Sequence, residues 1–293
     1  MTSTEDEAEI EASRAPLLDH LIELRSRLIV CAAALVAGFL VTFVFVTPLL
    51  HFLLHPFAIA ESLAAARNSH GGKMGSFGML MALLGQHAAP DAKFISTAPL
   101  EVFFEKVKLA GFGAIVISFP VLAFQLYRFV APGLYRRERR AFLPFLVASP
   151  VLFLMGAALV YFVMLPFVLW FSLNQQILGG GPGDVTVELL PKLSDYMSLV
   201  TTLVLAFGLC FQLPVILSLL GMAGLVTSKL LISGWRYAIV GVFLVAAVVT
   251  PPDPISMMSL ALPICLLYFA SIWCVQLIEW RRAREEAATE PAA

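Results

Sequence analysis

The chain has 293 residues, of which 60% are hydrophobic and only 13% are charged, and its formal net charge is −1. Soluble domains typically carry about 45–50% apolar and about 25% charged residues, so this composition excludes a fold around one water-surrounded core. The charge balance gives no sign of nucleic-acid binding, and we take the solvent of this chain to be a lipid bilayer.

The amino-terminal part is expected to be a tail followed by a helix. Residues 1–16 are acidic and lack the positive region and apolar core of a signal peptide, so we predict no cleavable signal and a disordered tail. Over residues 17–28, leucines recur at helical spacing and predict a short amphipathic helix. Glu23 and Arg27 form an i,i+4 pair on its polar side. This helix leads directly into a first membrane span at about residues 29–47.

The segment between about residues 48 and 99 contains no apolar run of the about 20 residues that a bilayer core requires. We therefore predict an outer cap of short surface or re-entrant helices. Pro56 is expected to break any helix there, because proline lacks a backbone N–H donor. The glycine-rich stretch at 68–78 is expected to be flexible.

Five further apolar segments predict membrane spans at about residues 101–130, 144–171, 196–221, 237–249 and 255–278. The fifth has only about 13 residues, which cover roughly 20 Å of a hydrocarbon core about 30 Å thick. We expect the bilayer to thin locally at that end of the protein. Residues 279–293 are predicted to be a disordered cytoplasmic tail. The predicted fold class is an all-α integral membrane protein with six transmembrane helices.

The orientation follows from the distribution of basic residues. The loop-forming stretch at 124–140, FQLYRFVAPGLYRRERR, holds five of the nineteen Lys and Arg residues. With the amino terminus inside, the outer segments hold six: Arg67, Lys73, Lys93, Lys106, Lys108 and Lys192. The other thirteen then lie in inner segments, which predicts that both termini are cytoplasmic.

Motifs for catalysis are missing from the sequence. There is no GxxxxGK[ST], HExxH or GxSxG motif, so we expect no ATP hydrolysis and no enzyme activity. The four cysteines lie in apolar runs without CxxC spacing, and the five histidines are scattered. We expect no disulfide, metal or cofactor. Gln212 is a strongly polar residue in the middle of a span, where either an interhelical hydrogen bond or a functional role would explain it.

Two acidic residues stand among basic ones on the predicted cytoplasmic side. Glu23 lies in HLIELRSRL and Glu138 in LYRRERR. One interpretation is that both carboxylates accept guanidinium groups from a partner, because such pairs are bidentate and selective for arginine. The other is that each acid pairs with its own neighbour, Glu23 with Arg27 and Glu138 with the flanking arginines. Asp253, in TPPDP, is either a turn-forming residue or a polar group at the outer membrane boundary.

Four stretches together resemble the TatC family, whose members are core subunits of the twin-arginine protein translocase. They are HLIELRSRL at 20–28, FPVLAFQLYRFVAPGLYRRERR at 119–140, FQLP at 211–214 and TPPD at 250–253. The resemblance covers about residues 16–278, and the order of the motifs and the six-span pattern agree with it.

The resemblance implies a receptor for signal peptides that carry two consecutive arginines. With single-span TatA- and TatB-type subunits, such a receptor exports folded proteins across the cell inner membrane at the expense of the protonmotive force. It also implies a homo-oligomer within a hetero-oligomeric complex. The two signal-binding carboxylates match Glu23 and Glu138, and Arg25 and Phe129 match residues beside them.

Four further points concern positions outside the signal-binding motifs. Pro56 and Asp253 match a proline and an acid that the family carries in its outer segments. Gln212 stands where the family often has Glu, so ionisation is lost there while hydrogen bonding is retained. The insert at about 64–86 receives no role from the resemblance.

A secondary transporter of a small solute and a purely structural scaffold remain the alternative functions.

Overall fold

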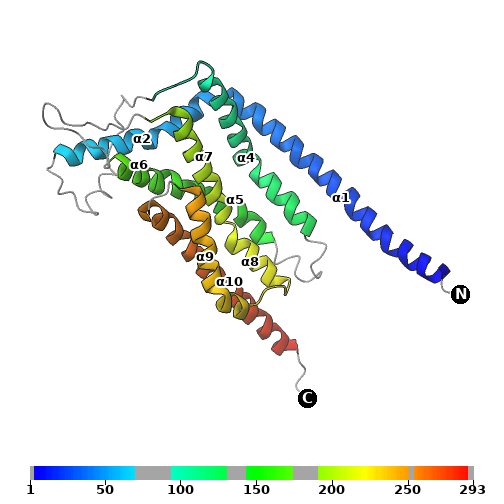
Figure 1. The fold of residues 1–293 in the computed structure, drawn as a ribbon. Coiled ribbons are helices and arrows are strands. Elements are labelled where there is room, and N and C mark those ends of the chain that lie inside the picture. Colours follow the sequence, from blue (N-terminus) through cyan, green and yellow to red (C-terminus); the bar gives the residue numbers. More distant parts are fainter. Residues whose placement is uncertain (1–2, 70–93, 131–142, 174–190, 251–253, 290–293) are drawn as a thin grey trace. The chain divides into compact units, whose positions relative to one another are not determined.

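The structure is a computed structural model, and it describes residues 3–69, 94–130, 143–173, 191–250 and 254–289 (Figure 1). The helices in chain order are α1 (Ser3–Val44), α2 (Val46–Ser69), α4 (Glu101–Val130), α5 (Leu143–Leu159), the π-helix η2 (Val160–Met164), α6 (Leu165–Leu173), α7 (Leu193–Cys210), α8 (Leu213–Met222), α9 (Ser228–Val249) and α10 (Pro254–Thr289). Within the described residues, extended pairing is limited to a single bridge between Ile95 and Lys192.

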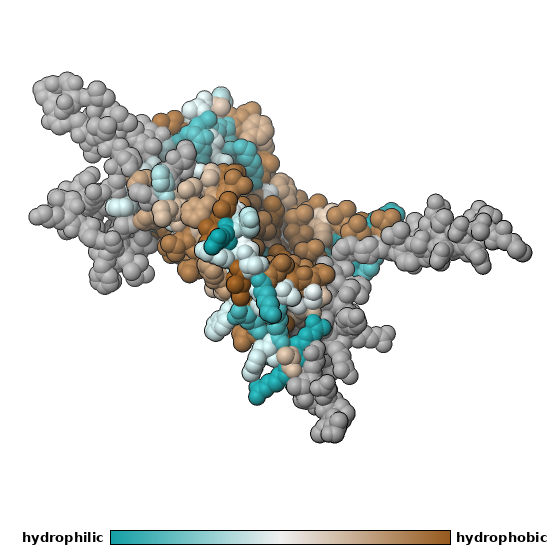
Figure 2. Space-filling model, turned by 60° about the horizontal axis from the view of Figure 1, so that its bottom comes forward, coloured by the Kyte–Doolittle hydropathy of each residue, from teal (hydrophilic) through white to brown (hydrophobic). Residues whose placement is uncertain are grey.

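Six segments are long and apolar enough to cross a membrane. They are Leu21–Val44, Glu101–Arg128, Val147–Leu173, Leu193–Met222, Ser228–Val249 and Met257–Arg284. A helix satisfies its own backbone hydrogen bonds, which lipid cannot do, so helices are the expected form of these segments. Figure 2 shows hydrophobic residues over a large part of the visible surface, as expected for side chains that face lipid. The predicted all-α fold with six spans is confirmed.

The chain divides into two compact units, which are described separately here. The first comprises Met1–Val44 and Ala110–Pro150, and the second comprises Phe45–Leu109 and Val151–Ala293. The boundaries fall inside α4 and α5, so these two helices contribute to both units.

In the first unit, α1 and α4 pack closely through small residues. The Ser118 hydroxyl donates a hydrogen bond to the backbone oxygen of Ala34 at 2.7 Å. A Cβ atom on Gly38 would lie 2.7 Å from Ser118 Oγ, and one on Gly113 would overlap the methyl group of Thr42. Small residues let membrane helices approach each other in this way. The contact fixes the register of α1 against α4, and therefore positions the polar residues at the ends of both helices.

In the second unit, α2 passes through Pro56 without ending there, so the predicted helix break is wrong. Pro56 cannot donate to the backbone oxygen of Phe52, four residues before it. That oxygen instead accepts a hydrogen bond from the Tyr161 hydroxyl at 2.8 Å, and the adjacent oxygen of Leu53 accepts one from the Tyr196 hydroxyl at 2.7 Å. Two tyrosines from other helices thus satisfy the backbone around the proline, and the helix continues.

Two predicted single spans are interrupted in the structure, and a proline follows each interruption. In the third span the π-helix η2 precedes Pro166, and the wider turn brings Tyr161 to α2. In the fourth span, α7 and α8 are separated at Phe211 and Gln212, two residues before Pro214. Because proline deprives a preceding carbonyl of its donor, local departures from α-helical bonding are expected at both places.

The fifth span is longer than the sequence indicated. Helix α9 begins at Ser228 rather than at Tyr237, and its 22 residues give a length of about 33 Å at about 1.5 Å per residue. Thr227 caps its first turn by accepting a hydrogen bond from the backbone N–H of Leu230 at 3.3 Å. The Glu279 carboxylate of α10 also accepts one from the Ser228 N–H at 2.8 Å. The expected thinning of the bilayer is therefore not required by helix length.

Both predicted tails differ from the structure. Helix α1 already begins at Ser3, and the separate amphipathic helix and first span form one continuous helix up to Val44. Helix α10 continues to Thr289 beyond the predicted end of the sixth span. Alanine and glutamate are frequent at both ends of the chain. Both residues are strong helix formers, and the prediction of disordered tails did not take this helix propensity into account.

Candidate functional site

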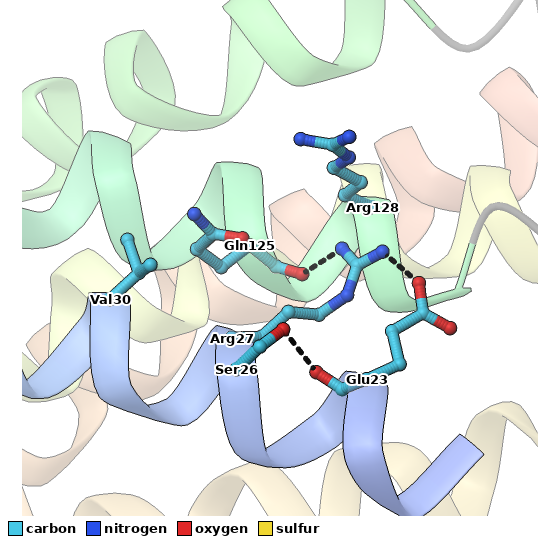
Figure 3. Close-up of a pocket in the computed structure, with 6 residues that line it drawn as sticks. All are labelled: Glu23, Ser26, Arg27, Val30, Gln125 and Arg128. Carbon is cyan, nitrogen blue, oxygen red and sulfur yellow. Dashed lines mark hydrogen bonds and ion pairs between the residues drawn. The ribbon is translucent and has the colours of Figure 1, made fainter. Parts of the chain in front are cut away.

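A polar pocket lies in the first unit where α1 meets the last turns of α4. It encloses about 280 Å³ and is lined by Glu23, Ser26, Arg27, Val30, Gln125 and Arg128 (Figure 3). Leu21 begins the first membrane span and Arg128 ends the second, so the pocket is at a membrane boundary. The close packing of α1 on α4 holds its two walls together.

The Arg27 side chain connects these walls. Its Nη2 atom forms an ion pair with Glu23 Oε1, one helical turn earlier on α1. Its Nη1 atom donates to the backbone oxygen of Gln125 on α4 at 3.3 Å. Charged residues four apart lie on the same face of a helix, so the sequence itself brings Glu23 and Arg27 together.

Burial differs between the partners of this ion pair. The side chain of Arg27 is 12% exposed, whereas that of Glu23 is 37% exposed. Among the described residues, the buried Nε atom of Arg27 has no hydrogen-bond partner. On Glu23, the bond from Arg27 uses Oε1, and Oε2 is directed away from Arg27 (Figure 3). The carboxylate therefore retains an oxygen that can accept a further donor.

The charges that line the pocket are not balanced. Among the described lining residues there are two guanidinium groups, on Arg27 and Arg128, and one carboxylate, on Glu23. Arg128 is exposed, forms no ion pair within the described ranges, and directs its guanidinium away from Glu23 (Figure 3). The described lining therefore carries one more positive than negative charge.

The structure places only some of the predicted site residues. Glu23 lines the pocket, whereas Arg25 lies on α1 with an exposed side chain and does not line it. Phe129 is in the last turn of α4, and its side chain is not described. Glu138 lies outside the described residues. The predicted pair of carboxylates therefore stays a prediction.

The other predicted positions belong to the second unit. Gln212 is 6% exposed, at the N-cap position of α8, and its backbone oxygen accepts from Ile216 at 2.9 Å. Pro56 is fully buried inside α2. Asp253 lies outside the described residues. Among the residues that the structure describes, no three His, Cys, Asp or Glu side chains gather as metal ligands would.

The sequence did not single out four of the pocket residues: Ser26, Val30, Gln125 and Arg128. Gln125 contributes its backbone oxygen, and a backbone acceptor leaves no trace in the residue type. Ser26 lines the pocket, but its hydroxyl donates to the Glu23 backbone oxygen at 3.0 Å. Its place one turn from Glu23 and beside Arg27 on the helix surface is the signal that would have identified it.

Comparison with known proteins gives consistent matches along most of the chain. A family model described as "Sec-independent protein translocase protein (TatC)" matches residues 19–263. A protein named "Sec-independent protein translocase protein TatC" from Magnetococcus marinus is 40% identical over 277 residues, which cover 94% of this chain and 90% of that protein. One of the same name from Synechocystis is 34% identical and covers 89% of this chain and 88% of its own length.

A solved structure is also similar. The crystal structure described as "Twin Arginine Translocase Receptor- TatC" superposes with a TM-score of 0.67 and 31% sequence identity. The match covers 88% of this chain and 98% of the crystallised one.

Proposed function

The chain belongs to the TatC family of Sec-independent protein translocase proteins, and from this premise we propose that its Glu23 pocket receives an arginine of a twin-arginine signal peptide. The protein is a multi-pass membrane protein and a core component of the twin-arginine translocase. The family is one of protein translocation components, and the matches lend no support to a secondary transporter.

One observation carries the proposal: the Glu23 carboxylate already binds a guanidinium, that of Arg27. The pocket therefore provides the geometry and the partial burial that an arginine side chain needs. Guanidinium–carboxylate contacts are charge-assisted and are frequently bidentate, which favours arginine over lysine. The exposed Glu23 side chain leaves room for a group that arrives from the solvent.

The second arginine of the signal peptide is proposed to bind Glu138. This residue follows α4, whose last turns form one wall of the pocket. Arg25 and Phe129 are proposed to contact the peptide beside the two carboxylates. Their support is the match of both motifs to the family.

The assembly around the pocket is proposed as well. The protein would lie in the cell inner membrane with both termini in the cytoplasm, as the basic residues predict. TatA- and TatB-type single-span subunits would join several copies of the chain, and the protonmotive force would drive export of folded precursors. Gln212, Pro56 and Asp253 are proposed to serve contacts within this assembly rather than signal recognition. A bilayer-facing surface such as that of α9, where Val240, Leu244 and Val248 are exposed, is suited to such helix–helix contacts.

Photocrosslinking tests the proposal directly. A photoreactive amino acid replaces Ser26 in the pocket, which leaves both proposed carboxylates in place, and the full-length protein is mixed with a precursor that carries either two arginines or two lysines. We expect strong adducts with the arginine precursor and several-fold weaker ones with the lysine precursor. The same amino acid at Glu61, which is exposed on α2, should give neither. Equal adducts from both precursors would overturn the assignment of the pocket.

Replacement of the carboxylate provides a second test. Glu23→Gln should weaken binding of a twin-arginine peptide by about 10- to 100-fold, because a charge-assisted hydrogen bond contributes about 1.5–3 kcal/mol. Membrane insertion should be unchanged, since Glu23 is at the boundary of its span. Glu61→Gln removes one charge elsewhere and serves as the control. Normal peptide binding by the Glu23 variant would exclude this residue from the receptor site.

A further inference from the structure

We propose that Arg27 is a built-in competitor for the signal-peptide arginine, so that the peptide binds by displacing Arg27 from Glu23. This inference rests on the proposed function of the pocket and adds how its occupancy is controlled. In the resting receptor, the guanidinium of the protein occupies the carboxylate that the peptide needs.

The first support is the position of the guanidinium. Arg27 pairs with Glu23 through Oε1, one of the two carboxylate oxygens that a bidentate contact from a peptide arginine would need. Among the described residues that line the pocket, Glu23 carries the one carboxylate that an incoming arginine could use. Because two cations cannot share the bidentate face of one carboxylate, full engagement of the peptide requires Arg27 to leave.

The second support is that Arg27 is held incompletely. Its hydrogen bond to the Gln125 oxygen is long, at 3.3 Å. Its buried Nε atom has no acceptor among the described residues, and a buried donor without a partner is unfavourable. A guanidinium held in this way can be displaced more easily than one whose five N–H groups are all satisfied. The pair with Glu23 is therefore suited to exchange.

The third support is the excess of positive charge. Arg128 already lines the same pocket and has no ion-pair partner within the described ranges. An arriving arginine would add a further guanidinium to a pocket in which, among the described lining residues, Arg27 and Arg128 already outnumber the carboxylate of Glu23. Mutual repulsion then disfavours a state in which Arg27 stays on Glu23 while the peptide binds. Arg27 therefore lowers the apparent affinity of the pocket for an incoming peptide. A lysine cannot form a bidentate contact with Glu23, so it displaces Arg27 less well than an arginine does.

Binding measurements on Arg27 variants test the inference. The full-length protein in lipid nanodiscs is titrated with a dye-labelled synthetic peptide that carries two arginines, and with its two-lysine version. Arg27→Gln should bind the arginine peptide about two- to fivefold more tightly, the factor that corresponds to a partly exposed ion pair. The lysine peptide should gain more, so the preference for arginine should fall. Arg284→Gln, which removes an exposed charge in the second unit, should change neither affinity.

A second background separates competition from general electrostatics. With Glu23→Gln in place, removal of Arg27 should bring no gain, since no carboxylate remains to be competed for. Arg27→Lys keeps the charge and serves as a second variant where Arg27→Gln folds poorly. The lysine ammonium cannot contact Glu23 and the Gln125 oxygen at the same time, so this variant should show an intermediate gain in affinity for the arginine peptide. An unchanged or weaker affinity of both Arg27 variants, or a gain that persists without Glu23, would overturn the inference. If the unmodified protein shows no preference for two arginines, the proposed function fails first and the competitor fails with it.

Discussion

Two glycines of α4 have opposite surroundings although one residue separates them. A Cβ atom on Gly113 would overlap the Thr42 side chain on α1, whereas one on Gly111 would meet nothing within 4 Å. Gly113 therefore permits the close approach of the helices, and Gly111 only adds flexibility to the unfolded chain. The position of the Glu23 pocket depends on the first of these two residues.

Alanine substitutions at these glycines are expected to have effects of opposite sign. Gly113→Ala should lower the free energy of unfolding by about 1–3 kcal/mol, because the added methyl group overpacks the helix contact. Gly111→Ala should raise it by about 0.5–1 kcal/mol, because alanine is the better helix former. Unfolding of the purified protein in detergent, followed by circular dichroism, measures both. A loss of equal size at both positions would contradict the packing derived for α1 and α4.

Residue spacing predicted part of the candidate site. The i,i+4 spacing of Glu23 and Arg27 predicted their ion pair, and the structure confirms it. The same spacing could not show that Gln125 of α4 holds the other end of Arg27, because this contact uses a backbone oxygen across 98 positions of sequence. Long-range backbone contacts depend on how the helices pack and are not encoded in the identity of either residue.

At the scale of an element, α2 shows how a helix can contain a proline. The Phe52 oxygen loses its helical donor at Pro56 and receives the Tyr161 hydroxyl instead. The rings of Phe52 and Tyr161 also stack, with their centroids 4.3 Å apart. The tyrosine thus attaches α2 to the third span through both a hydrogen bond and an aromatic contact.

A double-mutant cycle tests this compensation. Tyr161→Phe keeps the ring and removes the hydroxyl, so it should lower the free energy of unfolding by about 0.5–1.5 kcal/mol, the net contribution of one partly buried hydrogen bond. In the Pro56→Ala background, residue 56 regains an N–H that can bond to the Phe52 oxygen. Tyr161→Phe should therefore lower the free energy of unfolding by clearly less in that background. Unfolding midpoints of the four proteins in detergent give the coupling energy. Additive effects would show that the hydroxyl does not replace the donor missing at Pro56.

The type of each element could be predicted better than its limits. Apolar runs identified all six spans, although the fifth run was shorter than the about 20 residues that a bilayer requires. The start of α9 was predicted too late, at residue 237 instead of Ser228, and the residues between these positions include the basic Lys229 and Arg236. Long basic side chains extend along a helix to reach the membrane surface, so charge near a span does not mark its end.

At the scale of the whole molecule, the orientation in the membrane rests on the distribution of positive charge. The carboxyl-terminal turns of α10 carry Arg281, Arg282 and Arg284, all exposed. Ser96, by contrast, is exposed in the segment that leads into α4. The next residue in this segment, Thr97, is bound to α4, because its N–H donates a hydrogen bond to the Glu101 carboxylate at 2.7 Å. Basic residues favour the cytoplasmic side, which predicts that Arg284 is inside and Ser96 outside.

Labelling of single cysteines decides this orientation. The four native cysteines, all partly buried in membrane spans, are first replaced, and Ser96→Cys or Arg284→Cys is then introduced separately. A membrane-impermeant maleimide should label Ser96→Cys in intact cells and Arg284→Cys only after the membrane is opened. The cysteine-free protein gives the background. The opposite pattern would place the Glu23 pocket on the outer side, because Leu21 and Arg284 begin the first span and end the sixth. A pocket there could not meet signal peptides of cytoplasmic precursors, so this measurement tests the orientation and the proposed receptor function together.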